Sequence, residues 1–314
     1  MSEITIVTAY FDIGRNNWKG FERGTNKYIN YFKFWARIQN KVIIYTSPQF
    51  VDEIFEIRKQ FGLEDKTKII AIDNMINFDK DLYHKINKVM DNDISLLFHK
   101  EPHRPEAWSG DYNYIMMLKS YCIVDAIKNE YASGMIAWMD FGYNHGGKDG
   151  LIKEEEFNFL WKYEFSSKMH VFTEQKLDLE RPIFDIVRSM DVYIRGNLMI
   201  APDFLWEKFN YLSKQAMMSL LYCGLCDDDQ TITLMVVYEY PNIFEIHDVA
   251  FWYSGLKGFG GAHFTVQKDS IPKIKKYRLH KDKARMLFVN GKYKLAFNEY
   301  KQYTKERIMS KLKK

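Results

Sequence analysis

The chain has 314 residues, of which 46% are hydrophobic and 27% are charged, a composition that excludes an intrinsically disordered protein. A chain of this length buries enough surface to fold without disulfides or a structural metal. The net charge of +4 is unevenly distributed along the chain. Residues 268–314 carry 16 Lys and Arg against 4 Asp and Glu, a net charge of +12, which leaves −8 on residues 1–267. The acidic main part of the chain argues against a general nucleic-acid binder.

Three features predict a cytosolic protein. The chain opens on the strand-like run Ile4-Thr5-Ile6-Val7-Thr8 instead of a basic and then apolar signal, and no apolar run approaches the ~20 residues of a membrane span. Three cysteines are an odd number and too few for a disulfide framework. We therefore expect the protein in the reducing cytosol.

The first quarter of the chain alternates between β-branched apolar runs and helical patterns. Strands are predicted at residues 4–11, 41–46 and 68–72, and helices at residues 25–39 and 49–62. Strands that alternate with helices form a parallel sheet with right-handed crossovers. The sequence therefore predicts an α/β fold.

The remaining elements follow a less regular order. They are strands at residues 135–139, 169–172 and 192–200, and helices at residues 112–131, 203–223 and 231–238. No linker rich in Gly, Pro or Ser and no internal repeat divides the chain. The simplest organisation is one domain over residues 1–267, followed by a basic extension over residues 268–314.

A candidate ligand site follows the predicted strand that ends at Met139. Ligands of open α/β sheets bind at the carboxyl ends of strands, where Asp140 begins the run Asp-Phe-Gly-Tyr-Asn-His-Gly-Gly. Carboxylate, amide and imidazole groups bind divalent cations, and the glycines let a ligand approach the backbone closely. In the alternative interpretation, Asp140 caps a turn and His145 is only solvated.

A second candidate site is the acidic run Asp227-Asp228-Asp229-Gln230 between two predicted helices. Adjacent carboxylates repel one another, so a chain tolerates them best at a helix N-terminus or beside a cation. One of the three is expected to cap the helix that begins at Thr231, and Asp227 is expected to face solvent. Capping does not explain all three acids. His103, His247 and His263 are isolated in the sequence and are expected to make structural hydrogen bonds.

Together these segments resemble the HtrL/YibB family of bacterial proteins, which is associated with lipopolysaccharide and capsule loci. The resemblance covers most of the chain and is carried by the segments 8–15, 138–142, 228–231 and 241–244. The order of these segments is also similar to that of GT-A glycosyltransferases. The resemblance implies a GT-A-like, Rossmann-like fold with a mixed, mainly parallel sheet flanked by helices.

The resemblance also implies how the chain is divided and which residues act. Residues 1–150 would bind the donor, a nucleotide-diphosphate sugar, and residues 151–267 the acceptor. The donor is expected at Thr8, Ala9, Tyr10, Arg15, Lys119 and Tyr143. Asp229, or Asp228 if the loop turns one residue earlier, is expected as the catalytic carboxylate beside Gln230.

The implied metal site departs from the GT-A pattern. Gly142 stands where these enzymes usually carry the second Asp of Asp-x-Asp. A Mn²⁺ or Mg²⁺ ion would then be bound by Asp140 with help from Asn144, His145 or a distant histidine such as His263, or the metal is dispensable.

The function implied by the resemblance is hexosyl transfer from a nucleotide sugar to a glycan or lipid-linked glycan of the lipopolysaccharide, lipooligosaccharide or capsule type. Two alternatives remain open from the residues. One is a non-catalytic binding or regulatory protein with a GT-A fold, suggested by the missing second Asp. The other is a nucleotidyl- or phosphotransferase, because a carboxylate at a strand end also suits that chemistry.

The basic extension carries a loose apolar stripe among its lysines. Leu295, Phe297, Tyr300, Tyr303, Ile308 and Leu312 form this stripe. Such a segment can lie on an anionic inner membrane, with each Lys or Arg adding about 1 kcal/mol. Equally, the stripe can pack on the domain while the lysines only solvate it.

Overall fold

The computed structural model describes residues 2–145, 150–249 and 252–267, and in the C-terminal part residues 280–281, 283–284, 287–288 and 292–312. Its centre is a seven-stranded sheet. In spatial order the strands are β4 (Thr67–Ala71), β3 (Val42–Thr46), β2 (Thr5–Tyr10), β5 (Met135–Met139), β9 (Ile194–Pro202), β8 (Met169–Thr173) and β10 (Phe244–Asp248).

One strand runs against the rest of this sheet. All neighbouring strands are parallel except β9, which is antiparallel to both β5 and β8. Numbered along the chain, the sheet strands have the spatial order 3-2-1-4-6-5-7, whereas the common doubly wound sheet has the order 3-2-1-4-5-6. The prediction of an α/β fold with a mixed, mainly parallel sheet is confirmed.

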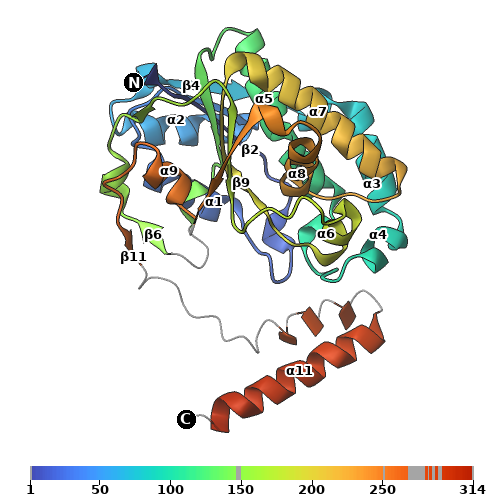
Figure 1. The fold of residues 1–314 in the computed structure, drawn as a ribbon. Helices are drawn as coiled ribbons and strands as arrows, with labels where there is room; N and C mark the ends of the chain where they lie inside the picture. The colour runs from blue at the N-terminus through green and yellow to red at the C-terminus, as the bar shows by residue number, and fades with distance from the viewer. Residues whose placement is uncertain are drawn as a thin grey trace.

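Helices cover both faces of the sheet (Figure 1). One face is covered by α1 (Thr25–Trp35), α2 (Val51–Lys59) and α9 (Ser254–Gly258). The other is covered by α3 (Lys80–Met90), α5 (Gly110–Lys128), α7 (Asp203–Tyr222) and α8 (Asp229–Glu239). The shorter α4 (Asp93–Phe98) packs on α3, and α6 (Ile183–Ser189) packs on α8.

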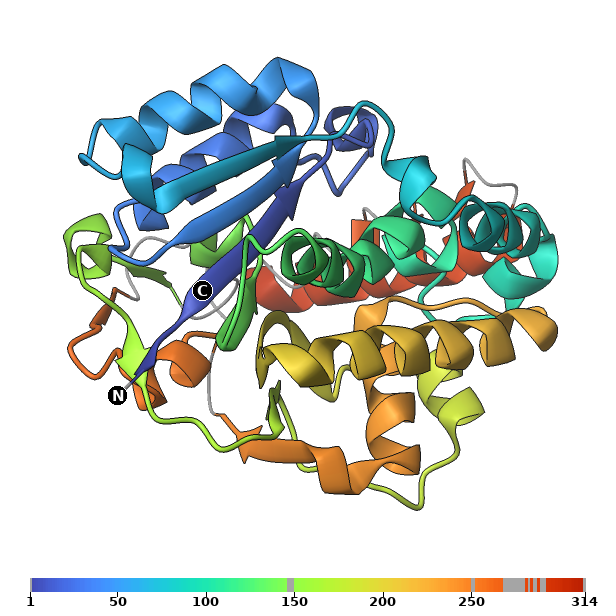
Figure 2. The same ribbon diagram turned by 90° about the horizontal axis from the view of Figure 1, so that it is seen from above.

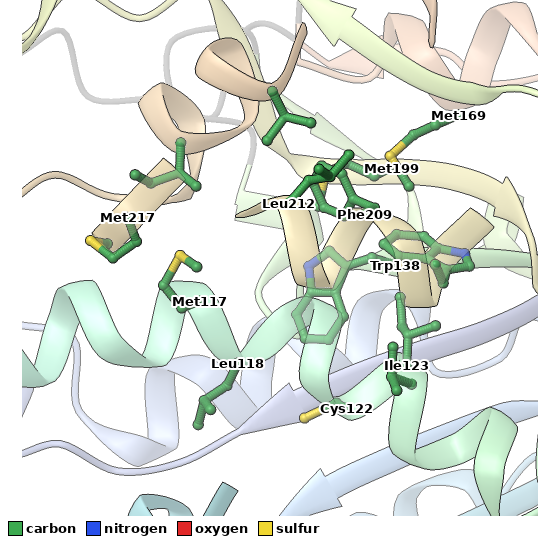
Figure 3. Close-up of a cluster of buried hydrophobic side chains, with 14 of the residues drawn as sticks. Met117, Leu118, Cys122, Ile123, Trp138, Met169, Met199, Phe209, Leu212 and Met217 are labelled. Atoms are coloured by element: carbon green, nitrogen blue, oxygen red, sulfur yellow. The ribbon is translucent and has the colours of Figure 1, made fainter. Parts of the chain in front are cut away.

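The three layers follow from the side-chain alternation of buried strands. In β2, Val7 joins the core beneath α5, whereas Ile6 and Tyr10 join the core beneath α1. Both faces of a covered parallel strand are apolar, which explains why β3 is buried at all five positions. Figure 3 shows the core beneath α5, a single cluster that includes Met117 and Ile123 of α5 and Phe209 of α7. This packing holds α5 in place, and the buried side chain of Lys119 extends from α5 to the sheet.

Small elements complete the described structure. Two antiparallel pairs flank the main sheet: β1 (Ser2–Glu3) with β7 (Lys162–Tyr163), and β6 (Leu151–Ile152) with β11 (Val266–Gln267). The helix α11 (Tyr293–Leu312) lies within the predicted basic extension. Among the described residues, no helix has both the length and the apolar character needed to cross a bilayer.

The predicted strands and helices are all present, with shifted ends. α8 begins at Asp229, two residues earlier than predicted, because Asp228 caps it. Among the elements with no counterpart in the sequence-based prediction are α3, α4, α6, α9 and β10.

Candidate functional site

A cavity of about 310 Å³ opens at the carboxyl ends of β2 and β5, where ligands of α/β sheets bind. The segment after β2, the segment after β5 and the start of the reversed strand β9 meet there because β9 enters the sheet from this edge. The N-terminus of α8 and one face of α5 close the opposite side. The volume lies at the small end of the range of ligand pockets.

The base of the cavity is a buried cluster of one lysine and two aspartates. Lys119 of α5 lies 2.8 Å from Asp229 Oδ2 and 3.2 Å from Asp140 Oδ1, and it donates a hydrogen bond of 2.8 Å to the carbonyl oxygen of Gly196. Asp140 Oδ1 also accepts a 2.7 Å bond from Trp138 Nε1. These contacts bring together three residues that lie far apart in the chain.

Burial and charge act in opposite directions in this cluster. Burial by itself would lower the pKa of Lys119, but the Asp140 and Asp229 carboxylates outweigh it and raise the pKa, so the lysine stays cationic. Burial raises the pKa of Asp229, and Lys119 only partly opposes this effect. A buried carboxylate with a raised pKa is a stronger proton acceptor than an ordinary one, which suits a general base.

Gly196 is required by the close packing of this cluster. A Cβ at this position would lie 2.2 Å from Asp229 Oδ2 and 3.0 Å from Lys119 Nζ. Because both side chains are buried and paired, neither can withdraw without leaving its partner. The glycine of β9 therefore belongs to the site through its lack of a side chain.

Arg15 forms a cationic wall of the cavity. Its guanidinium carbon lies 5.2 Å from the ring centre of Trp18, 5.9 Å from that of Tyr28 and 5.4 Å from that of Tyr112. It also donates a 2.6 Å hydrogen bond to Tyr28 Oη. Three rings hold the guanidinium in place, and Arg23 adds a second positive charge to the lining. Two arginines at one wall suit a diphosphate.

Acidic groups with raised pKa values form the remaining wall. Burial raises the pKa of Glu106, and burial followed by the neighbouring Asp229 and Asp227 carboxylates raises that of Asp228 well above its ordinary value. Burial therefore favours the protonated form of both carboxyl groups. Asp228 also caps α8, since Gln230 donates its backbone N–H to Asp228 Oδ1.

Asp227 does not face solvent, and that expectation was wrong. Its exposed fraction is 4%, and burial raises its pKa to about 7. Its Oδ1 accepts the backbone N–H of Asp228. The carboxyl group lies behind the cap of α8 and does not line the cavity.

The predicted metal ligands fit a divalent ion only in part. Asp140 and His145 line the cavity, and burial lowers the pKa of His145 to about 3, which leaves a neutral imidazole at physiological pH. The Asn144 amide is used elsewhere, because it donates to the Ile152 carbonyl and accepts from Tyr253 Oη. Asp140 and His145 thus remain as candidate ligands on the cavity lining, and a Mg²⁺-type ion bound by few protein groups takes its other ligands from water and substrate phosphates.

Three predicted site residues lie outside the cavity. Thr8 is fully buried within β2, where its neighbours on the chain, Ala9 and Tyr10, reach the lining instead. Tyr143 is fully buried, and its carbonyl accepts a 2.7 Å bond from Trp252 Nε1. His263 is exposed and contacts the Glu156 carbonyl oxygen. Tyr143 therefore positions a cavity residue without lining the cavity itself.

The other predicted site residues converge on the cavity. Its lining includes Ala9, Tyr10, Arg15, Lys119, Asp140, His145, Asp228, Asp229 and Gln230. Arg23, Glu106 and Tyr112 also line the cavity and were not predicted from the sequence. No pattern of spacing marks these three residues. Only the proximity of Arg23 to the segment after the first strand offered a signal.

Comparisons with known proteins identify relatives over most of the chain. A family model described as "Bacterial protein of unknown function (HtrL_YibB)" matches residues 2–260. Protein HtrL of Escherichia coli (strain K12) is 32% identical over 261 residues, which cover 78% of this chain and 88% of that protein.

Solved structures show only distant similarity. Mouse xyloside xylosyltransferase 1 in its apo form has 11% identity and a TM-score of 0.39 over 79% of this chain and 86% of that one. A glycosyltransferase involved in the glycosylation of the major capsid of PBCV-1 has 12% identity and a TM-score of 0.35 over 79% and 82%. Similarity at this level leaves the function to be inferred from the residues of the cavity.

Proposed function

The chain belongs to the HtrL/YibB family, and from this premise we propose that it is a glycosyltransferase that uses a nucleotide-diphosphate sugar. The observation that supports the proposal most is the placement of two kinds of group around one cavity. Arg15, which lies among three aromatic rings, forms one wall, and the cluster of Lys119, Asp140 and Asp229 lies at the base. Glycosyl transfer needs both kinds, cations for the diphosphate and a carboxylate near the sugar.

The donor site must stabilise the negative charge of the leaving diphosphate. The leaving diphosphate gains negative charge as its bond to the sugar breaks. Arg15 and Arg23 supply fixed positive charge, and the three rings around Arg15 reduce the movement needed to bind phosphate. Asp140, with His145, would hold a divalent ion, which when bound supplies further positive charge to the diphosphate.

The acceptor hydroxyl must lose its proton during the transfer. In an inverting transfer the acceptor hydroxyl oxygen attacks the anomeric carbon, the bond from that carbon to the diphosphate oxygen breaks, and Asp229 takes the hydroxyl proton. In a retaining transfer the same carboxylate faces the positive charge on the sugar. Lys119 keeps Asp229 in place through their 2.8 Å ion pair. Gln230, next along α8 and in the cavity lining, would bind acceptor hydroxyls.

A donor screen tests this function. At 100 times its dissociation constant, a true donor should stabilise the protein by ~2.7 kcal/mol in a thermal-shift measurement. We expect a nucleotide-diphosphate sugar to give this shift, to give a larger one with Mn²⁺ than with EDTA, and to be hydrolysed slowly without acceptor. An Arg15→Met variant should lose the shift.

Two results of the same screen would contradict the proposal. Stabilisation and turnover with nucleoside triphosphates, and none with nucleotide sugars, would indicate a nucleotidyl- or phosphotransferase. Stabilisation by a nucleotide sugar without any hydrolysis or transfer, across a panel of acceptors, would indicate a binding protein.

We further propose that the acceptor is a cell-surface glycan of the lipopolysaccharide or capsule type, presented at an anionic membrane surface. The support comes from α11, in which Leu295, Phe297 and Ile308 have exposed fractions of 47%, 58% and 53%. Exposed lysines lie among them, and Lys301 lies 4.7 Å from the ring centre of Phe297. Tyr303, another residue of the apolar stripe, is buried, with an exposed fraction of 8%. Leu312 lies outside the residues whose burial is described.

Liposome sedimentation tests the membrane contact. The full chain should pellet with anionic vesicles at low salt and be released at high salt, because screening weakens the attraction. A Phe297→Gln/Ile308→Gln variant keeps every charge and should pellet less. Equal pelleting of the variant and the parent protein, or binding undiminished by salt, would contradict a membrane role for α11.

A further inference from the structure

A cluster of two histidines and one glutamate lies on strands β8 and β10, and none of its residues lines the cavity. His170 of β8 pairs in register with Glu245 of β10, and His247 follows Glu245 by two residues. Residues two apart on a strand share a face, so all three side chains project from the same face of the sheet. His247 was predicted to be an isolated histidine, because nothing in the sequence links it to His170.

The ligand atoms of the three side chains lie close together, and the two ring nitrogens face each other, with ring centres 5.2 Å apart. His170 Nδ1 lies 2.9 Å from His247 Nε2, and Glu245 Oε1 lies 4.0 Å from the first nitrogen and 3.9 Å from the second. A point in the plane of these three atoms is about 2.1 Å from each of them, which matches Zn–N and Zn–O bond lengths. Within the described part of the chain, no other group of three such residues brings its ligand atoms within 4.8 Å of one another.

The surrounding contacts orient the ligand atoms inward. His170 Nε2 lies 3.2 Å from the Ser166 carbonyl oxygen, and an Nε2–H that donates to this oxygen leaves a lone pair on Nδ1. The Ser166 hydroxyl donates a 2.6 Å bond to Glu245 Oε2, which leaves Oε1 turned toward the histidines. A backbone carbonyl behind a histidine and a hydroxyl behind a carboxylate are the outer contacts that metal ligands usually have.

The environment of the cluster is aromatic on one side and open on the other. The His247 ring lies 4.4 Å from the ring of Phe259 and 5.4 Å from that of Phe172, measured between centres. The His170 side chain is 2% exposed, that of His247 15% and that of Glu245 44%. The open side leaves room for a water molecule as a fourth ligand, and in a tetrahedral site the ion would lie out of the plane of the three atoms, toward that side.

We propose that His170, Glu245 and His247 form a binding site for a zinc ion, separate from the transferase cavity. Two imidazole nitrogens favour Zn²⁺ over Mg²⁺ or Ca²⁺, which prefer oxygen, and zinc also accepts a carboxylate oxygen as a ligand. The ion would link the edge strand β10 to β8 at the side of the sheet opposite β4 (Figure 2). Five residues after His247 the chain reaches Trp252, which lines the cavity.

Zinc titration of the full chain tests the site without any donor, so its result does not depend on the proposed function. After treatment with a chelator, the protein should bind one Zn²⁺ per chain in isothermal titration calorimetry and unfold at a higher temperature with Zn²⁺ than without it. Co²⁺ should bind in its place and give the visible absorption of a four-coordinate ion.

Single variants identify the ligands. His247→Gln and Glu245→Gln should each weaken zinc binding by about 100-fold, and Ser166→Ala, which removes only an outer contact, by about 10-fold. Glu245 is the most exposed of the three ligands, so its variant should keep the fold and melt, without zinc, near the temperature of the parent protein. His84→Gln, an exposed histidine of α3, is the matched control and should bind zinc normally.

Two outcomes would overturn the proposal. In the first, the parent protein binds no zinc, and the two histidines only share a hydrogen bond. In the second, folded Glu245→Gln and His247→Gln variants bind zinc as tightly as the His84→Gln control, which would place the ion elsewhere.

Discussion

An Asp229→Asn variant should bind the nucleotide sugar as tightly as the parent protein and transfer the sugar at least about 100-fold more slowly. A carboxylate that accepts a proton or faces a cationic sugar acts mainly in the transition state, so its loss lowers kcat and leaves donor affinity unchanged. Donor affinity is measured by calorimetry and kcat by product release. The acidic limb of the pH–rate profile should also change, because burial raises the pKa of Asp229 and its ionisation should govern that limb.

The structure indicates that this variant will fold. Lys119 keeps two of its three partners, Asp140 and the Gly196 carbonyl, so its charge is not left unpaired. Asn also has the shape of the protonated aspartic acid. Asp227→Asn is the matched control, since it changes the same group two residues earlier behind the helix cap, and it should retain activity. A collapse of donor affinity together with the rate would place Asp229 in the donor or metal site.

The sheet could be predicted because its strands are covered on both faces. Covered strands need apolar residues at every position, and β3 shows this as an unbroken run from Val42 to Tyr45. The edge strand β10 lacks that signal, because its half-buried positions, Glu245 and His247, are polar and the exposed position between them is Ile246. α3 was missed although Asp79 caps it and Leu82 and Ile86 repeat at helical spacing.

The candidate site could be predicted where it depends on strand ends. Asp140 and Arg15 follow parallel neighbouring strands, so topology alone brings them to one edge. Lys119 and Asp229 lie on different helices, and the resemblance to GT-A enzymes singled them out where periodicity could not. Glu106 reaches the cavity only through tertiary packing, and no local pattern predicts that.

The burial of Asp227 shows the limit of reasoning from residue type. Adjacent carboxylates repel one another in water, so sequence analysis favours an exposed position for at least one of them. In the folded chain, backbone donors and the N-terminus of α8 offset part of that repulsion, and the raised pKa values of Asp227 and Asp228 reduce the rest.

An Asp140→Asn variant should lose activity by about 100-fold or more without unfolding. Its carboxylate is the one that both contacts Lys119 and follows the strand end where a diphosphate would lie, so the change removes charge from the donor side of the site. The fold should persist, because an Asn oxygen can still accept the 2.7 Å bond from Trp138 Nε1. Turnover and thermal unfolding are measured on the same preparation.

The Asp140→Asn and Asp229→Asn variants should differ in how Mn²⁺ affects their stability, and this difference separates the roles of the two carboxylates. Loss of an ion-binding carboxylate should abolish the extra stabilisation that Mn²⁺ gives in the presence of donor, whereas Asp229→Asn should keep it. Asp203→Asn is the matched control, because Asp203 follows β9 at the opposite edge of the sheet and binds the backbone N–H of Gly134. It should keep both activity and the Mn²⁺ effect. If a folded Asp140→Asn variant retained near-full turnover, the carboxylate at the end of β5 would have no part in donor binding or metal binding.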